Sequence, residues 1–330
     1  MVSQRDIAEA VGVSVATVST VLANKSAALG ICEATAGRVR RAARQLGYRP
    51  NLTASGLRTR RHYAIGLMFF NPSELLYGEL MTELQARLTA CHYAGVCAFW
   101  HDEQDVGAAF ESVVTRGVDG LITCHADPSV VPAGLPAVTF EWQAPAWDSV
   151  VRDGPDALLR GLRYLLSLGH RRIGMLNVNR GDHEREVVAE MRRQGVDEGP
   201  VWMANVRLNY LDESRRAVRR LLSAPPAGRP TALICRNDTV AMMAMSVAGR
   251  LGLHIPGDLS VLGFDNVAIG AMANPPLTTL GIRPGELARK LVDLMMRRLA
   301  APDAPVRRIR LRKRLVIRDS CAPPPGAQTG

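Results

Sequence analysis

The sequence predicts a mixed α/β protein in which an all-α headpiece precedes two lobes, each built on a parallel sheet. Two observations predict this fold class. Short helical patterns and much of the excess positive charge fill residues 1–61, and from residue 62 onward apolar, strand-like runs alternate with helical patterns. The alternation restarts after about Pro155, which indicates a second lobe. A chain of 330 residues is long enough for a small module and a two-lobed body.

The headpiece begins with two predicted helices over Ile7–Asn24, joined by a turn. Gly12 supplies the left-handed backbone that ends the first helix, and Ser14 can cap the second. Each helix has an apolar face, formed by Ile7, Ala8 and Val11 in the first and by Val15, Val18, Val21 and Leu22 in the second. This pattern is typical of a helix-turn-helix, whose second helix enters the major groove of DNA.

The outward face of the second helix has short side chains, namely Ala16, Thr17, Ser19 and Thr20. Small residues let a helix approach another surface closely, and hydroxyl groups can bond phosphate oxygens. A small helical hairpin that binds no nucleic acid is the alternative.

Positive charge gathers at both ends of the chain, whose formal net charge is +10. Residues 1–61 hold ten Lys or Arg and three acidic residues, and residues 302–320 hold seven and two. A basic head on a near-neutral body is typical of a polyanion-binding module. The C-terminal run could be only a solvated face, whereas the N-terminal charge coincides with the predicted helix-turn-helix.

A third helix is predicted from about Cys32 to Leu46, and Pro50 ends it by disfavouring helical backbone at Arg49. The following segment, Leu52–Thr59, is too short for a stable isolated helix. We therefore expect it to fold only against DNA or a second copy of the chain.

The body is predicted to hold two runs of alternating strands and helices. The predicted strands are Ala64–Phe70, Gly95–Phe99, Val118–Thr123, Ala137–Phe140, Arg172–Asn177, Ala232–Cys235 and Ser260–Phe264. The predicted helices lie near Tyr77–His92, Val106–Thr115, Pro155–Leu168, Glu184–Arg193, Glu213–Ser223, Thr239–Leu251 and Pro284–Leu299. In such folds a ligand binds beyond the carboxyl ends of the strands, here in a cleft between the lobes.

Several classes of protein are disfavoured. No uncharged apolar run is long enough to span a membrane and the N-terminus lacks a signal-peptide pattern, so we expect a cytoplasmic protein. The six cysteines include no Cys-x-x-Cys pair and no histidines at ligand spacing, so we expect neither a metal nor a cofactor. The chain has no nucleophile elbow and no phosphate-binding glycine loop, and we do not expect an enzyme.

Eight motifs occur in the order known from one family. They are Asp6-Ile7-Ala8, Gly12–Ser19, Leu46–Asn51, Leu57-Arg58-Thr59, Gly117–Ile122, Leu168–Ile173, Gly263-Phe264-Asp265 and Pro275–Thr279. Together they resemble the LacI family of bacterial transcription repressors over nearly the whole chain.

The resemblance implies a DNA-binding headpiece over residues 1–49, a hinge helix and linker over 50–60, and an effector and dimerisation domain over 61–320. This last domain would have two Rossmann-like lobes, like a periplasmic binding protein. Lobe 1 would span about 61–155 with 284–301, and lobe 2 about 156–281 with the last strand, before a disordered tail at 321–330. The implied partners are a second copy of the chain, a pseudo-palindromic operator and a small effector, such as a sugar or related metabolite.

DNA contacts follow from the resemblance residue by residue. Base-reading positions fall on Val15, Ala16 and Thr20, and phosphate-contacting or helix-positioning sites fall on Ser14, Thr17, Ser19 and Asn24. In the implied hinge helix, Asn51 is the first residue, Ala54 takes a minor-groove contact, and Leu57 is the wedge between base steps. The family often has arginine at the position of Thr20, so base readout here should depend on thymine methyl groups and DNA shape.

Effector contacts implied by the resemblance fall on Tyr77, Glu141, Asn237 and Asp265. Carboxylates and amides at strand ends suit the paired hydroxyls of a sugar. Alternatively, Asn237 or Asp238 could cap the helix that follows, Asp265 could be a turn residue and Glu141 could be solvated. The arginine that the family places on the helix after Asn177 has no clear counterpart, which leaves a non-sugar effector, or none, open.

The sequence thus predicts a sequence-specific DNA-binding repressor whose operator affinity is altered by a small molecule. The alternative is a cytoplasmic small-solute-binding protein with weak or non-specific DNA binding. Binding to DNA must weaken steeply as salt rises, whereas binding of a sugar should not.

Overall fold

The computed structural model describes residues 2–22, 26–48, 61–70, 75–100, 104–124, 131–132, 134–176, 182–194, 196, 203–204 and 211–326. The chain divides into two compact units, Met1–His62 and Tyr63–Gly330, which we call the headpiece and the body. Within the described ranges, no helix is long and apolar enough to cross a membrane.

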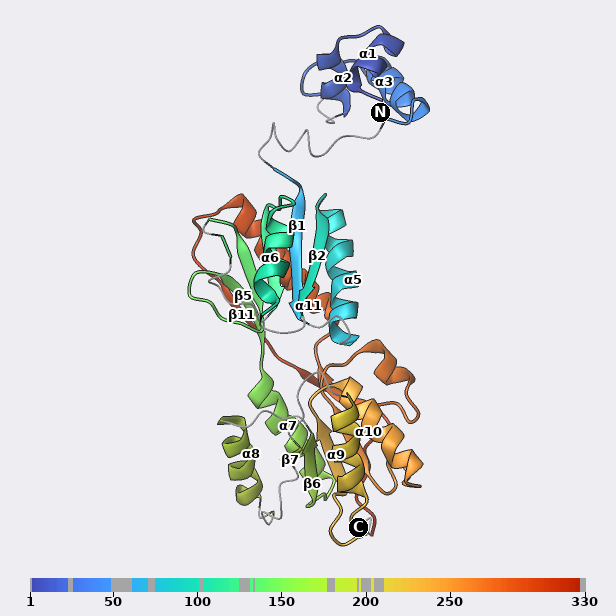
Figure 1. Cartoon of the computed structure of the whole chain (residues 1–330), viewed down its shortest axis with the longest axis vertical. Coiled ribbons are helices and arrows are strands. Elements are labelled where there is room, and N and C mark those ends of the chain that lie inside the picture. Colours follow the sequence, from blue (N-terminus) through green and yellow to red (C-terminus); the bar gives the residue numbers. More distant parts are fainter. Residues whose placement is uncertain are drawn as a thin grey trace. The chain divides into compact units, whose positions relative to one another are not determined.

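The headpiece contains three helices, α1 (Gln4–Val11), α2 (Val15–Leu22) and α3 (Glu33–Gln45) (Figure 1). A capping box of Ser3 and Asp6 begins α1, and Gly12 ends it with a left-handed φ of 73°. The Ser14 hydroxyl caps α2 by accepting from the backbone N–H of Thr17 at 3.1 Å. The predicted turn and cap are therefore confirmed. Apolar faces of the three helices meet in a small core of Ile7, Ala8, Val11, Val18, Val21, Ala36, Val39 and Ala43.

The body contains two six-stranded sheets. Sheet A has the order β11-β5-β4-β3-β1-β2 and is parallel throughout. Its strands are β1 (Ala64–Phe70), β2 (Ala94–Trp100), β3 (Gly120–Cys124), β4 (Ala137–Phe140), β5 (Asp148–Arg152) and β11 (Arg308–Leu311). Sheet B has the order β12-β10-β9-β8-β6-β7, with β12 antiparallel to β10. Its strands are β6 (Ile173–Leu176), β7 (Met203–Ala204), β8 (Ala232–Cys235), β9 (Ser260–Gly263), β10 (Thr278–Gly281) and β12 (Arg314–Val316).

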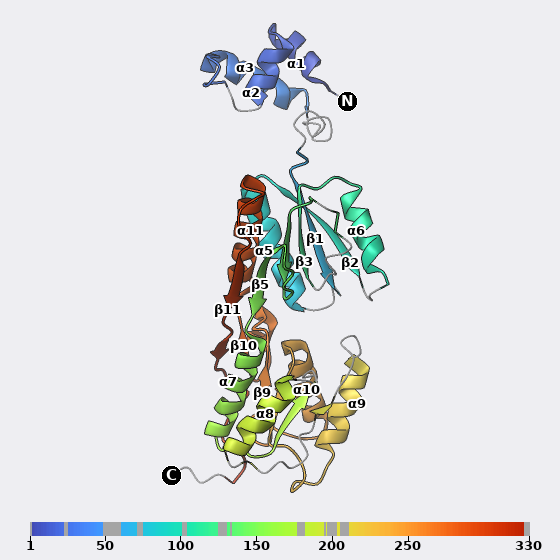
Figure 2. The same ribbon diagram turned by 90° about the vertical axis from the view of Figure 1, so that its left-hand side faces the viewer.

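Helices cover both faces of each sheet, as the two views show (Figures 1 and 2). In the lobe of sheet A, which we call lobe 1, α5 (Leu75–Ala90) and α11 (Pro284–Ala300) pack on one face and α6 (Val106–Val114) on the other. In the lobe of sheet B, lobe 2, α9 (Leu211–Leu222) and α10 (Asp238–Arg250) cover one face, and α7 (Gly154–Ser167) and α8 (Asp182–Arg193) the other. The two predicted parallel-sheet lobes are thus present.

The chain passes between the lobes three times, after β5, after β10 and after β11. Asp153, a residue that is only 4% exposed, ties two of these crossings together through its carboxylate. It accepts from the backbone N–H of Lys313 at 2.7 Å and from Arg160 at 2.7 Å, and Arg160 also donates to the Lys313 carbonyl at 2.8 Å. The first and third crossings are therefore held side by side by buried, charge-assisted hydrogen bonds.

The C-terminal region differs from the expectation in two respects. The last strand, β12, extends sheet B, but the strand before it, β11, was not expected and extends sheet A, so residues 308–311 belong to lobe 1. The expected disordered tail also begins too early, because Ala322 is hydrogen-bonded to lobe 2. Its N–H donates to the Ser260 hydroxyl at 3.0 Å, and its carbonyl lies 2.9 Å from Nε2 of His170.

His170 is a buried histidine that ties three segments of lobe 2 together. Its Nδ1 lies 2.9 Å from the hydroxyl of Thr231, and its Nε2 lies 3.0 Å from that of Ser260. Burial lowers the pKa of His170 below its usual value of 6.5. The folded state therefore prefers the neutral ring.

We predict that His170 makes the body less stable as the pH falls below about 6.5, where the unfolded chain binds the proton more readily than the folded chain. Each proton taken up contributes at most about 1.4 kcal/mol per pH unit to the free energy of unfolding. Chemical denaturation between pH 7 and 5 measures this slope. A His170→Gln variant should show a shallower slope than the unchanged chain, and an equal slope would contradict the prediction.

Candidate functional site

The outward face of α2 is the candidate DNA interface. Val15 is 43% exposed although it is apolar, and Ala16 is exposed beside it. Thr17, Ser19 and Thr20 are half-buried, and the hydroxyls of Ser14 and Thr17 lie 2.9 Å apart. The other predicted DNA contacts, Asn24, Asn51, Ala54 and Leu57, lie outside the described residues, as does the whole of the expected hinge segment at 50–60.

The basic side chains of α3 are the second part of the candidate DNA interface. Arg38 is used internally, since it donates to the backbone carbonyl of Val11 at the end of α1. Arg40 pairs with Glu33 at 2.7 Å on the same helix. Arg41 and Arg44 are exposed on α3 and can meet a polyanion.

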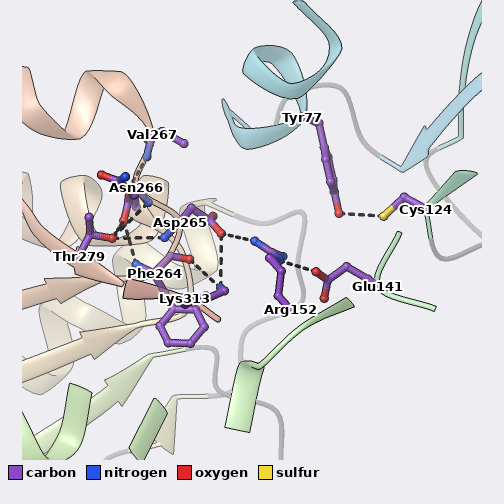
Figure 3. Close-up of polar contacts among 11 residues, drawn as sticks. Tyr77, Cys124, Glu141, Arg152, Phe264, Asp265, Asn266, Val267, Thr279 and Lys313 are labelled. Carbon is purple, nitrogen blue, oxygen red and sulfur yellow. Dashed lines mark hydrogen bonds and ion pairs between the residues drawn. The ribbon is translucent and has the colours of Figure 1, made fainter. Parts of the chain in front are cut away.

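The candidate effector site lies where strands of both sheets end. Glu141 directly follows β4 of lobe 1, and Asp265 follows β9 of lobe 2 by one residue. Both carboxylates bind Arg152, the last residue of β5, which donates through Nε to Glu141 and through Nη1 to Asp265 at 2.9 Å (Figure 3). The structure thus brings two predicted residues together through a third that the sequence analysis missed.

Arg152 and Lys313 are the two basic side chains of this cluster. Burial alone would lower the pKa of Arg152, but the carboxylates of Glu141 and Asp265 outweigh it and raise that pKa. The guanidinium also lies 5.1 Å from the ring centroid of Phe140. Burial and the charge of Arg152 lower the pKa of Lys313 to about 7. Its ammonium nitrogen lies 3.9 Å from Asp265 and 3.7 Å from the ring centroid of Phe264.

Asp238 orients the loop that holds Asp265. One oxygen of its buried carboxylate accepts from the Phe264 N–H at 2.8 Å and from the Thr279 hydroxyl at 2.6 Å, and the other accepts from the Val267 N–H at 2.9 Å. Gly263 permits this approach, since a Cβ there would lie 2.2 Å from the Asp238 carboxylate. The buried carboxylate therefore fixes the backbone on both sides of Asp265.

The other two predicted contacts are engaged locally. Asn237 is the N-cap of α10, and its side-chain oxygen accepts from the Val240 N–H at 2.9 Å, as in the capping alternative. Tyr77, on α5, is buried and its hydroxyl lies 3.3 Å from Sγ of Cys124 (Figure 3). Its ring packs edge-on against Phe140, which also lies under Arg152.

Metal ligands do not gather in the part of the chain that the structure describes: no group of three or more His, Cys, Asp or Glu side chains there could hold an ion. The polar groups of the site are instead two carboxylates and two basic side chains, which suit hydrogen bonding to a small organic molecule.

A helical headpiece with an exposed recognition face, followed by a two-lobed α/β body, defines a class of regulatory proteins with separate DNA-binding and ligand-binding parts. Residues 4–51 match the family of bacterial regulatory proteins of the lacI type, and residues 162–321 match a periplasmic binding protein-like domain. The chain therefore combines a DNA-binding domain of the lacI type with a periplasmic binding protein-like domain.

Relatives and solved structures extend the likeness over nearly the whole chain. The HTH-type transcriptional repressor PurR of Vibrio vulnificus (strain CMCP6) is 26% identical over 97% of this chain and 98% of that protein. The lac repressor dimer bound to operator and the anti-inducer ONPF has a TM-score of 0.80 and 22% identity, over 97% of this chain and 99% of that one. A complex of the transcriptional regulator CelR with cellobiose has a TM-score of 0.67 and 21% identity, over 97% and 100%. At these identities the structures support the fold.

We predict that Asn237→Ala lowers the free energy of unfolding by about 1 kcal/mol, because α10 loses its N-cap. Asn237→Asp should preserve stability, since aspartate caps helices equally well. Urea denaturation of the two variants measures the difference. Equal stability of the Ala and Asp variants would contradict the capping role.

Proposed function

We propose that this chain is a sequence-specific DNA-binding repressor of transcription, whose affinity for its operator is altered by a small molecule bound between the lobes. The headpiece carries this proposal, because it combines a capped helix-turn-helix with an exposed recognition face at Val15 and Ala16. Its match to the lacI-type regulatory proteins over residues 4–51 supports the same function.

The proposed DNA complex pairs two copies of the chain on a pseudo-palindromic operator, as a two-fold protein requires. The lac repressor, whose fold this chain shares, was solved as a dimer on its operator. Val15, Ala16 and Thr20 would face the base edges, and Ser14, Thr17, Ser19, Asn24 and Asn51 would contact the backbone or position the helices. Ala54 and Leu57 would enter the minor groove.

The proposed effector contacts are Asp265 and Glu141 at the strand ends, together with Tyr77 and Asn237. Arg152 bonds both acids and Lys313 lies beside one of them, so the cluster suits a ligand with several hydrogen-bonding groups, such as a sugar or a related metabolite. The likeness to a regulator solved with cellobiose supports this class. We propose a cytoplasmic location and no enzymatic role, since the relatives are repressors.

The function is tested by measuring how the purified chain binds genomic fragments from upstream of its own gene at several salt concentrations. We expect a saturable complex on one pseudo-palindromic fragment, with affinity that falls steeply as salt rises. Equal affinity for every fragment would contradict sequence-specific repression. Absence of binding at every salt concentration would contradict the DNA-binding role altogether.

We predict that Val15→Ala weakens binding to that operator by about fivefold, because an exposed apolar contact of about 1 kcal/mol with a thymine methyl group is lost. Binding to random DNA should not change. Arg41→Ala is the matched control. It should weaken binding to both DNAs alike and lower the number of counterions released on binding, read from the salt dependence of the affinity, by about one. Fluorescence anisotropy with both DNAs measures these effects, and an equal loss on both for Val15→Ala would exclude base readout by this residue.

A further inference from the structure

Both carboxylates that we assign to the effector are engaged by a side chain of the protein itself. Arg152 bonds Glu141, which follows a strand of lobe 1, and Asp265, which follows a strand of lobe 2 (Figure 3). Its guanidinium therefore joins the ends of strands from two different sheets. It lies between the two acids, where the polar groups of a ligand that bonds both would have to lie.

The three side chains leave little surface for a ligand while they are joined. The exposed fraction is 14% for the side chain of Arg152, 19% for that of Glu141 and 10% for that of Asp265. A ligand that bonds both carboxylates must therefore displace the guanidinium. It must replace two charge-assisted hydrogen bonds that the chain already makes.

Charge balance makes Arg152 the main link in this cluster. Burial raises the pKa of Asp265, and the charges of Arg152 and, next, Lys313 oppose this effect. Without the guanidinium, two mostly buried carboxylates would share Lys313 alone, at 3.9 Å from one of them. Opening the bridge therefore changes the electrostatics of both lobes at once.

Two other polar contacts between the lobes lie at more accessible positions. Glu79 of α5 accepts from the Ala268 N–H, which begins the short 3₁₀ helix Ala268–Met272 of lobe 2, at 2.7 Å. Arg310 of β11 pairs with Asp156 of α7 at 2.8 Å, and both side chains are more than half exposed. Solvent screens such a pair, so it contributes little to joining the lobes.

We propose that Arg152 occupies the effector site of its own chain and that it joins the two lobes in the arrangement that binds the operator. In this proposal the effector is an inducer that displaces Arg152. This inference rests on the proposed function. A ligand shifts an equilibrium only towards the arrangement that it binds better, and this ligand binds better when the Arg152 bridge is open. Lobe 1 begins with Ala64, two residues after the headpiece ends, so a shift of lobe 1 on lobe 2 moves the strand that leads directly to the headpiece.

The test combines Arg152→Met with Glu141→Gln in the full chain, which removes one charge of each sign and leaves Asp265 with Lys313. Arg152→Lys is the milder variant, because one ammonium group cannot bond two carboxylates that lie on opposite sides of a planar guanidinium. Arg310→Met is the matched control, since it breaks an exposed ion pair between the same lobes. Spin labels at the exposed Glu111 of α6 and Arg250 of α10 report the distance between the lobes. The labels are introduced as non-canonical residues, because the exposed Cys32, Cys91 and Cys97 would also react with a cysteine-directed label.

We expect the double variant to broaden and lengthen the distance distribution between the labels, with a smaller change in Arg152→Lys and none in Arg310→Met. Operator affinity should fall by about tenfold in the double variant, a common size for coupling between sites, while affinity for random DNA stays constant. An unchanged distance distribution would show that Arg152 does not join the lobes. If the distance distribution changes but operator affinity is unaltered or higher, the arrangement in which Arg152 joins the lobes is not the one that binds the operator. If the unaltered chain fails to distinguish any operator, the proposed function falls, and the distance measurement still decides the role of Arg152.

Discussion

The two lobes depend on the hydrogen bonds that hold their crossing segments together. Asp153 is buried at the first crossing and accepts from the backbone of Lys313 in the third. This contact sets where two neighbouring side chains point. Arg152, one residue earlier, lies between Glu141 and Asp265, and Lys313 itself lies over the ring of Phe264. The charged cluster between the lobes is thus a direct result of how the chain crosses between its sheets.

Strands with continuous apolar runs could be predicted from the sequence, whereas strands with charged ends could not. Ala64–Phe70, Ala137–Phe140 and Ala232–Cys235 match the predicted bounds, because each run is wholly apolar or hydroxyl-bearing and is bounded by polar or turn residues. The sequence analysis missed the short strands β7 and β10. It also missed β5 and β11, which begin or end with charged side chains. Both lie at the side of sheet A where the chain crosses, so their pairing depends on segments far away in sequence.

The same distinction applies to the candidate site. The family resemblance assigns Glu141 and Asp265 to the effector, and the structure places both at strand ends of parallel sheets. Arg152 gave no local signal, because an arginine after an apolar run is equally typical of a solvated strand end. Its two partners are 11 and 113 residues away, and only the pairing of the lobes brings them together. Asn237 shows the opposite case, in which a local capping signal competes with an assignment to a ligand.

The order of strands in the sheets has a consequence for synthesis on the ribosome. The headpiece core is complete by Ala43, so this unit can fold while most of the body is still unmade. Neither lobe has this property. Lobe 1 needs α11 and β11 to cover and extend its sheet, and lobe 2 needs β12 and the hydrogen bonds of Ala322. A nascent chain therefore displays a folded headpiece core before either lobe of the body exists, and release of the last residues completes both lobes together.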